Sequence, residues 1–485
     1  MKTRHIPFIV VGIVSLLLSV IYSPPLDIYF DDKEIFKYSG FLIGKGEVPY
    51  KDFFDHKPPL IFFINYLGLL LGDWGLWIID AVLVLLVSLR FLKLNIDYQI
   101  RYPVILPILF NFILRHHVIS FGVGMTREYT TILILLACCV LLSTSRNKYY
   151  YLGILTALIF FMQQEQIIVL APFLVYSFVM VVKKKKRKPL LVSSAFLLGS
   201  VAVTAPILLY FLLNNALPDF WSNAFVFNTQ WYTTEEKPGL IRQLITLKNY
   251  IYDLNFDVMI IMALVMGGLA LFVGHERKGL LITALVAIPL SFISEFLSGK
   301  LSIGNASCTY YLIPLAATVP FLVFIVFAFT KQQLFKNRFH QLVYGLLLVA
   351  GFVMSTAMYV VNYNKYPRGG IAKSNEIKYL KDKNVQDYQL YVFNHSNFTY
   401  AYNRFQVLPP SKWLYHYFWG WYPNWDENAQ LIQSITANLR EHKTRYIIYD
   451  PQTTQFLRPQ NGKVWHNFLD SGYRRVPGLI IWESK

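Results

Sequence analysis

Apolar stretches close to twenty residues long recur through the first three quarters of the chain, with short polar segments between them. Runs of this length match the hydrocarbon thickness of a bilayer, so they predict a mainly α-helical polytopic membrane protein. Segment 60–71 is too short to cross comfortably, and it is predicted to be re-entrant or interfacial. The remaining segments give about eleven crossings, and the predicted total is 11–13. They lie approximately at 6–22, 74–92, 102–119, 129–144, 150–163, 167–182, 190–213, 257–273, 280–297, 310–330 and 340–361.

Beyond about residue 362 the pattern changes from long apolar runs to short mixed segments. Pro367 and Gly369-Gly370 end the last apolar run. Helical and strand-like patterns then alternate, which is typical of a small α/β domain. We therefore predict a transmembrane domain over residues 1–361 and an extracytoplasmic α/β domain over residues 362–485. The predicted helices are 376–383 and 429–442, and the predicted strands are 388–393, 446–449 and 478–482.

The distribution of charge orients these segments. Hydrophobic residues make up 55% of the chain and charged residues 15%, against about a quarter in soluble domains. If the N-terminus is cytoplasmic, the short cytoplasmic segments are rich in Lys and Arg and contain only Asp97 and Glu276 as acids. This is the positive-inside pattern. The run 183–188 lies between two predicted spans, so it is interpreted as a topology anchor and no nucleic-acid partner is predicted.

Cysteine spacing and the absence of common motifs argue against several other classes of protein. The chain has three cysteines, Cys138, Cys139 and Cys308, of which two are adjacent in an apolar run, so no disulfide framework is indicated. Walker, GxGxxG and HExxH motifs do not occur, which argues against a nucleotide-driven machine and a zinc protease. The N-terminal run resembles a signal peptide, but Ser23-Pro24-Pro25 is a poor cleavage site, so a retained first span is predicted.

The charge map places an acidic loop, residues 27–59, on the outer face directly after the first span. A surface helix is predicted over 31–43. Asp31 with Glu34 fits a capping pair. Asp32 cannot cap in the same register and shares a face with the apolar Phe36. Asp32 is therefore either a favourable charge at a helix N-terminus or a partly desolvated general base.

The second half of this loop presents a cation. Lys57 precedes Pro58-Pro59, which fix the backbone and remove two N–H donors. Beside Asp55, this lysine can hold a specific phosphate as a point charge, or it can snorkel to lipid headgroups. His56 is either a second phosphate donor or an interfacial residue.

Together these residues resemble a known family. Asp32, then Gly46-x-x-Pro49-Tyr50, then 52–59 (Asp-Phe-Phe-Asp-His-Lys-Pro-Pro) are similar to the first outer loop of superfamily C (GT-C) membrane glycosyltransferases. The nearest branch is bacterial and includes aminoarabinose transferases and protein O-mannosyltransferases. The resemblance implies a GT-C-type bundle in the bacterial inner membrane. It implies Asp32 as catalytic base, with Asp31 as the alternative, and Lys57 as ligand of the donor phosphate.

Two further segments fit the same resemblance. In 124–129 (Gly-Met-Thr-Arg-Glu-Tyr), Glu128 matches an acidic residue that heads a later span, whereas Arg127 replaces a second Glu. Arg127 and Glu128 are either substrate ligands or a paired interfacial couple. Tyr311 belongs to an aromatic-Leu-Pro start of a late span, a pattern that an aromatic belt also produces.

The predicted function is transfer of a sugar, with inversion, from a polyprenyl-phosphate-linked donor to an extracytoplasmic lipid, glycan or protein acceptor. Asp32 or Asp31 would act as base, and the substrate ligands would be Tyr50, Asp55, His56, Lys57, Arg127, Glu128 and Tyr311. No cofactor is certain, and a divalent metal would be compatible although no ligand spacing demands one. The alternative is an envelope lipid or oligosaccharide flippase or transporter, which needs ionisable residues in mid-span.

Overall fold

The computed structural model describes residues 5–25, 31–100, 102–115, 122–184, 188–230, 278–297, 313–329, 371–393, 395–414, 429–452 and 457–485. These residues fall into two compact units. The first lies within Met1–Asp27, Trp77–Leu209 and Lys237–Tyr366, and the second within Ile28–Leu76, Tyr210–Glu236 and Pro367–Lys485. The second unit therefore combines the acidic loop with the C-terminal residues, which the sequence assigned to separate domains.

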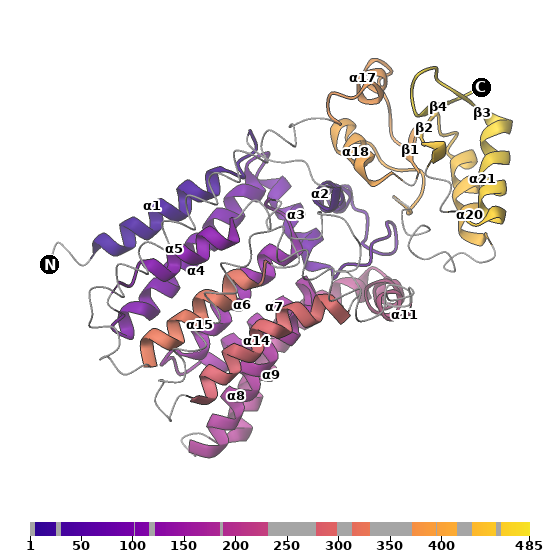
Figure 1. Ribbon diagram of the computed structural model, residues 1–485. Helices are drawn as coiled ribbons and strands as arrows, with labels where there is room; N and C mark the ends of the chain where they lie inside the picture. Colours follow the sequence, from indigo (N-terminus) through magenta and orange to yellow (C-terminus); the bar gives the residue numbers. More distant parts are fainter. Residues whose placement is uncertain are drawn as a thin grey trace. The chain divides into compact units, whose positions relative to one another are not determined.

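The first unit is built from apolar helices (Figure 1). Three helical stretches in the described part of the chain are long and apolar enough to cross a membrane: Gly75–Asp97, Gln164–Lys183 and Pro189–Leu213. They support the predicted integral membrane protein. The helices are α1 (Ile6–Val20), α4 (Gly75–Asp97), α5 (Ile105–Leu114), α6 (Thr126–Leu141), α7 (Lys148–Met162), η2 (Gln164–Gln166), α8 (Ile167–Lys184), α9 (Pro189–Leu213), α14 (Lys278–Leu297) and α15 (Leu315–Phe329).

Helix positions agree with the apolar pattern better than helix ends do. The predicted span at 102–119 is a shorter helix that ends at Leu114, and the span predicted from 129 begins at Thr126. Gly122 and Gly124 have positive φ values of 109° and 91° and form the turn before Thr126, a backbone shape that glycine adopts without strain. The predicted spans at 257–273 and 340–361 lie outside the described residues.

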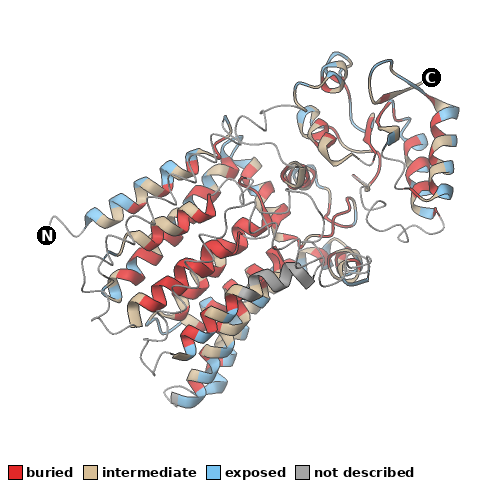
Figure 2. Cartoon of the chain, viewed as in Figure 1, coloured by how far each residue is buried: buried red, intermediate tan, exposed pale blue. Residues whose placement is uncertain are grey.

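Burial separates inner helices from outer ones in this unit. Helix α6 is buried along most of its length, whereas α9 exposes apolar side chains, including Leu190 at 76% and Leu213 at 72% (Figure 2). Exposed leucines on a helix of this length fit a lipid-facing surface. A Cβ atom built on Gly153 would lie 2.0 Å from the Phe196 carbonyl oxygen. Helices α7 and α9 therefore touch through their backbones, as small residues permit in membranes.

The second unit contains a four-stranded sheet with the order β1-β2-β4-β3. The β1 and β2 strands are parallel, and the other two pairs are antiparallel. The predicted α/β character is confirmed, and the C-terminal residues contain four elements that the sequence did not predict: η9, α18, α21 and β3. The elements are α2 (Asp31–Gly44), α3 (Leu60–Leu70), α10 (Leu217–Trp221), η3 (Ser222–Val226), α11 (Phe227–Gln230), α17 (Asn375–Asp382), β1 (Leu390–Val392), η9 (Ser396–Phe398), α18 (Thr399–Phe405), α20 (Gln430–Glu441), β2 (Tyr446–Ile448), α21 (Pro459–Gly472), β3 (Tyr473–Arg475) and β4 (Ile481–Ser484).

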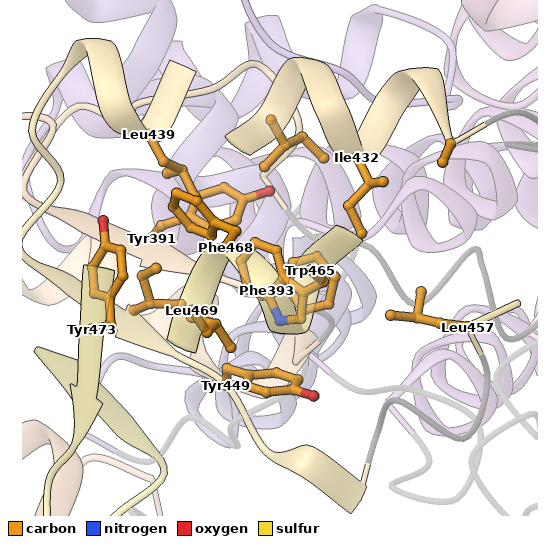
Figure 3. Packing of buried hydrophobic residues seen from close by; sticks show 13 residues of the cluster. Tyr391, Phe393, Ile432, Leu439, Tyr449, Leu457, Trp465, Phe468, Leu469 and Tyr473 are labelled. Carbon is orange, nitrogen blue, oxygen red and sulfur yellow. The ribbon is translucent and has the colours of Figure 1, made fainter. Parts of the chain in front are cut away.

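An aromatic cluster forms the core around this sheet (Figure 3). The rings of Phe393 and Trp465 stack with centroids 3.8 Å apart, and Tyr449 meets Trp465 edge-on at 5.7 Å. Trp465 is fully buried on α21. Stacked and edge-to-face pairs contribute about 0.5–1.5 kcal/mol each beyond the area they bury, so Trp465 helps to hold α21 to the sheet together with Phe468 and Leu469.

Segment 60–71, for which the sequence left two possibilities, is helix α3, and it packs closely on α2. A Cβ atom on Gly40 would lie 2.6 Å from the Tyr66 backbone nitrogen. Real Cβ atoms do not approach backbone so closely, so Gly40 is required where the two helices cross. Gly44, one turn later on α2, is different, because a Cβ there would lie 3.4 Å from the Tyr66 ring.

We predict that Gly40→Ala destabilises the protein by about 1–3 kcal/mol, the usual effect of overpacking. Gly44→Ala is the matched control, and it should leave stability unchanged or slightly higher because alanine favours helix. Thermal unfolding in lipid nanodiscs measures both. Equal midpoints for the two variants would contradict the close crossing of α2 and α3.

Candidate functional site

The loop after α2 folds into a tight turn. Gly46 has a φ of 94° and Tyr50 a φ of 70°. The Tyr50 backbone N–H donates to the Phe53 carbonyl at 2.8 Å, and the Asp52 carboxylate accepts from the Val48 N–H at 2.8 Å. Left-handed backbone at a residue other than glycine needs support from its surroundings. These two hydrogen bonds close the turn and provide such support.

Lys57 is held at both ends of its backbone. Its N–H donates to the Asp55 carboxylate at 2.8 Å, and its carbonyl accepts from the Tyr50 hydroxyl at 2.6 Å. Asp55 and Tyr50 are both buried. Burial, with a smaller effect of Asp55, raises the pKa of Tyr50 well above its usual value, so this hydroxyl remains a donor. The Lys57 side chain is half-buried, and it projects from a backbone that cannot rotate freely.

His56 is a buried residue next to Lys57. It is 4% exposed, and its Nδ1 lies 3.7 Å from the Asp55 carboxylate. The His56 carbonyl accepts from the Asn228 amide at 2.7 Å. Asn228 belongs to α11, so a segment far along the chain anchors the turn within the same unit. Burial of this kind fits a supporting residue better than an interfacial one.

The two neighbouring aspartates of α2 have different surroundings. Asp31 accepts from the Ser396 hydroxyl at 2.8 Å, and the Asn397 amide, oriented to donate, lies against the same carboxylate. Asp32 is half-buried, on the helix face that contains the buried Ile35 and Phe36. The partly apolar face predicted for Asp32 is therefore present.

Further contacts hold α2 to the C-terminal residues. The Glu34 carboxylate accepts from the Asn403 amide at 2.6 Å. The fully buried Tyr38 donates to the Val407 carbonyl at 2.6 Å, and its ring stacks on Tyr402 with centroids 4.9 Å apart. These partners were missed from the sequence. A separation of 369 residues leaves no local signal of the contact.

The first unit contains a buried charge cluster. The guanidinium of Arg115, directly after α5, bridges the carboxylates of Asp80 on α4 and Glu128 on α6. All three side chains are at most 1% exposed. The guanidinium also donates to the Ser19 hydroxyl at 3.4 Å, near the end of α1. Asp80 and Arg115 had no motif in the sequence and were not predicted.

Arg127 and Glu128 each pair with a different residue. Arg127 is 2% exposed and lies 3.5 Å from Glu165, which also accepts from the Gln163 amide at 2.8 Å. Glu165 follows the end of α7, and Arg127 stands at the start of α6. These contacts, with those of Arg115, bring the ends of α1, α5 and α7 together with the starts of α4, α6 and α8. The helices therefore alternate in direction, as the crossings predicted from the sequence require.

The structure thus groups the candidate residues in two sets. Asp31, Asp32, Tyr50 and the run 55–57 belong to the second unit, whereas Arg127 and Glu128 belong to the first. Tyr311 lies outside the described residues. Within the described ranges, no three His, Cys, Asp or Glu side chains gather as metal ligands.

Comparisons with known proteins find similarity among solved structures. No family model matches the sequence, and no curated protein matches it. Among solved structures, the chain is similar to the crystal structure of ArnT from Cupriavidus metallidurans bound to undecaprenyl phosphate, with 12% identity and a TM-score of 0.45. The match covers 90% of this chain and 72% of that chain. A similarity at this level determines neither the family nor the activity.

We predict that Arg115→Met destabilises the protein by about 3–5 kcal/mol, because it leaves two buried carboxylates without their cation. Lys93→Met is the matched control. Lys93 forms an exposed ion pair with Asp97, and an exposed helical pair contributes only about 0.3–0.5 kcal/mol. Thermal unfolding of the full chain in nanodiscs compares the two, and similar midpoints would show that the cluster is not structural.

A pH dependence is expected at the segment that holds Asp31. Burial lowers the pKa of His395 despite the opposing charges of Asp450 and Glu376. Protonation therefore disfavours the folded state. This contribution is complete above the ordinary pKa of about 6.5 and is lost as the pH falls through the lower folded value. Stability measured between pH 8 and pH 5 should fall less steeply for His395→Gln than for the wild type, and identical slopes would refute the assignment.

Proposed function

We propose that the protein transfers a sugar from a polyprenyl-phosphate-linked donor to a hydroxyl group of an extracytoplasmic acceptor. One observation carries this proposal. A compact unit holds both a half-buried carboxylate at the start of α2 and a lysine whose backbone is fixed by Asp55 and Tyr50. A base and a fixed cation are the two groups that such a displacement requires.

Asp32 is proposed as the base. Asp31 already accepts a hydrogen bond from Ser396, and a hydrogen bond to the charged form of a carboxylate makes it a weaker base. Asp32 is half-buried on the α2 face that contains Ile35 and Phe36, and the resemblance of the loop to GT-C glycosyltransferases favours this position for the base. The two adjacent aspartates then have different roles. Asp31 binds the C-terminal segment, and Asp32 accepts the proton.

The reaction is a single displacement. Asp32 accepts the proton of the acceptor hydroxyl. At the same time, the oxygen of that hydroxyl attacks the anomeric carbon from the side opposite the phosphate. The bond between that carbon and the phosphate oxygen breaks, and the polyprenyl phosphate leaves with both electrons. Lys57 stabilises the negative charge that develops on the phosphate. Attack from the opposite side inverts the anomeric centre.

The other candidate residues have supporting places in this proposal. Tyr50 and Asp55 position Lys57, and His56 either adds a donor to the phosphate or supports the turn from below. Arg127 and Glu128 already form buried ion pairs, so we assign them to the stability of the bundle and not to the substrate. A divalent metal at the phosphate would add to the charge of Lys57, and transfer measured after chelation tests for it. The proposed location is the bacterial inner membrane.

The transporter alternative has weaker support. It requires ionisable groups along a path through the spans. Among the described helices, the buried charges Asp80, Arg115 and Glu128 gather at one end of the bundle, where one guanidinium bridges both carboxylates. A cluster closed in this way fits a structural role.

We predict that Asp32→Asn lowers the rate of transfer by about 10²–10⁴-fold, the usual contribution of a general base. Asp31→Asn should lower it much less. The assay uses the purified protein in nanodiscs with labelled polyprenyl-phosphate sugar and a membrane extract as the source of acceptor. Transfer at the wild-type rate by both variants would refute the enzymatic role of the loop, and loss in Asp31→Asn alone would identify Asp31 as the base.

Lys57→Met should also lower transfer, because the leaving phosphate loses its cation. The matched control in the same loop is Lys51→Met. Lys51 is exposed, and its ammonium donates to the Asn214 carbonyl at 3.0 Å. Equal activities of the two lysine variants would contradict a specific role of Lys57 and would leave only a general effect of positive charge.

A further inference from the structure

A polar cavity of about 270 Å³ lies in the second unit, along helix α2. Three segments that are far apart in the sequence form its walls. Helix α2 and the end of α3 provide one side, and α18 provides the other. The lining residues are Glu34, Lys37, Phe41, Leu69, Asp73, Tyr400, Asn403, Arg404 and Gln406.

The residues that line the cavity carry equal numbers of formal positive and negative charges. Glu34 and Asp73 supply carboxylates, whereas Lys37 and Arg404 supply cations, so the formal charges cancel. Within the described residues, Lys37, Asp73 and Arg404 form no ion pair within 4.0 Å. Balanced but mutually unpaired charges do not select an anion or a cation. They offer donors and acceptors to a neutral ligand rich in hydroxyl groups.

Two further features limit the class of ligand that fits the cavity. Phe41 and Tyr400 supply aromatic surface among the polar groups, and the C–H face of a sugar ring packs on such surfaces. The volume lies just below the range of roughly 300–1,000 Å³ typical of drug-sized ligands, which suits a smaller molecule. The Glu34 carboxylate is already oriented by the Asn403 amide at 2.6 Å, so part of the wall is preorganised.

We infer that this cavity is a saccharide-binding site. Its residues Glu34, Lys37 and Phe41 follow one face of α2 over about 10 Å of helix, whereas Asp32 belongs to the face that contains Ile35 and Phe36. A sugar bound there would therefore lie close to the proposed base along the helix axis but on the other side of α2. It would then be the non-reducing or branch sugar of a glycan acceptor. That acceptor role rests on the proposed function, whereas the binding itself does not.

The test uses methyl glycosides of glucose, galactose, mannose and N-acetylglucosamine, titrated separately onto the full chain in nanodiscs and followed by saturation-transfer NMR. At least one is expected to bind with a millimolar Kd. Arg404→Ala should weaken that binding about tenfold or more, the effect of losing one charged hydrogen bond. Arg474→Ala, which removes an exposed arginine of β3 outside the cavity, should leave the Kd unchanged.

Tyr400→Leu provides a second variant, which keeps bulk and removes the aromatic face, and it should also weaken binding. Thermal unfolding confirms that each variant is folded. The inference is overturned if no glycoside binds at millimolar concentrations, or if Arg474→Ala weakens binding as much as Arg404→Ala does.

Asp32→Asn separates the two proposals, because glycoside binding should persist while transfer is lost. Binding without transfer in the wild type would refute the proposed function alone, and transfer unaffected by Arg404→Ala would refute the acceptor site alone.

Discussion

A guanidinium enclosed by two carboxylates is the constraint on which the first unit depends. Removing such charges from water has a penalty of several kilocalories per mole for each ion, which is offset only when the ions meet with good geometry. The planar fork of Arg115 meets Asp80 and Glu128 together and also reaches Ser19. Helices in lipid have no hydrophobic driving force between them, so close packing and polar contacts determine how they fit together. The charge cluster is such a contact, and it ties α1, α4, α5 and α6 to one another.

The second unit achieves order with hydrogen bonds and aromatic rings. Tyr50 shows how, since one buried side chain both fixes the Lys57 carbonyl and packs against the rings of Phe211 and Phe220. Tyr38 acts similarly between α2 and the C-terminal residues. The proposed reacting groups are thereby carried by backbone that is held on several sides. Such preorganisation is what electrostatic stabilisation of a departing phosphate requires.

Periodicity and charge predicted much of this structure, because both are local properties of the sequence. The helix from Asp31, the strands at Leu390 and Tyr446 and most apolar helices follow the hydrophobic pattern closely. Helix α18 and the contacts of Ser396 and Asn403 were not predicted from the sequence. The partners of these two residues lie more than 360 residues away. Asp80 and Arg115 were missed for a related reason. A single charge in an apolar run has no motif, and its meaning appears only when the fold brings its counter-ion beside it.

The contact between Tyr38 and Val407 also has a consequence for biosynthesis. The two residues are 369 positions apart, and a ribosome adds roughly 5–20 residues per second. The α2 helix therefore emerges roughly 20–70 s before the segment that packs on it is made. During that interval Glu34 and Tyr38 lack their native partners Asn403 and Val407. A chaperone or translocation factor that shields the nascent loop would act in this interval, and shortening the chain from its C-terminal end would prolong the interval indefinitely.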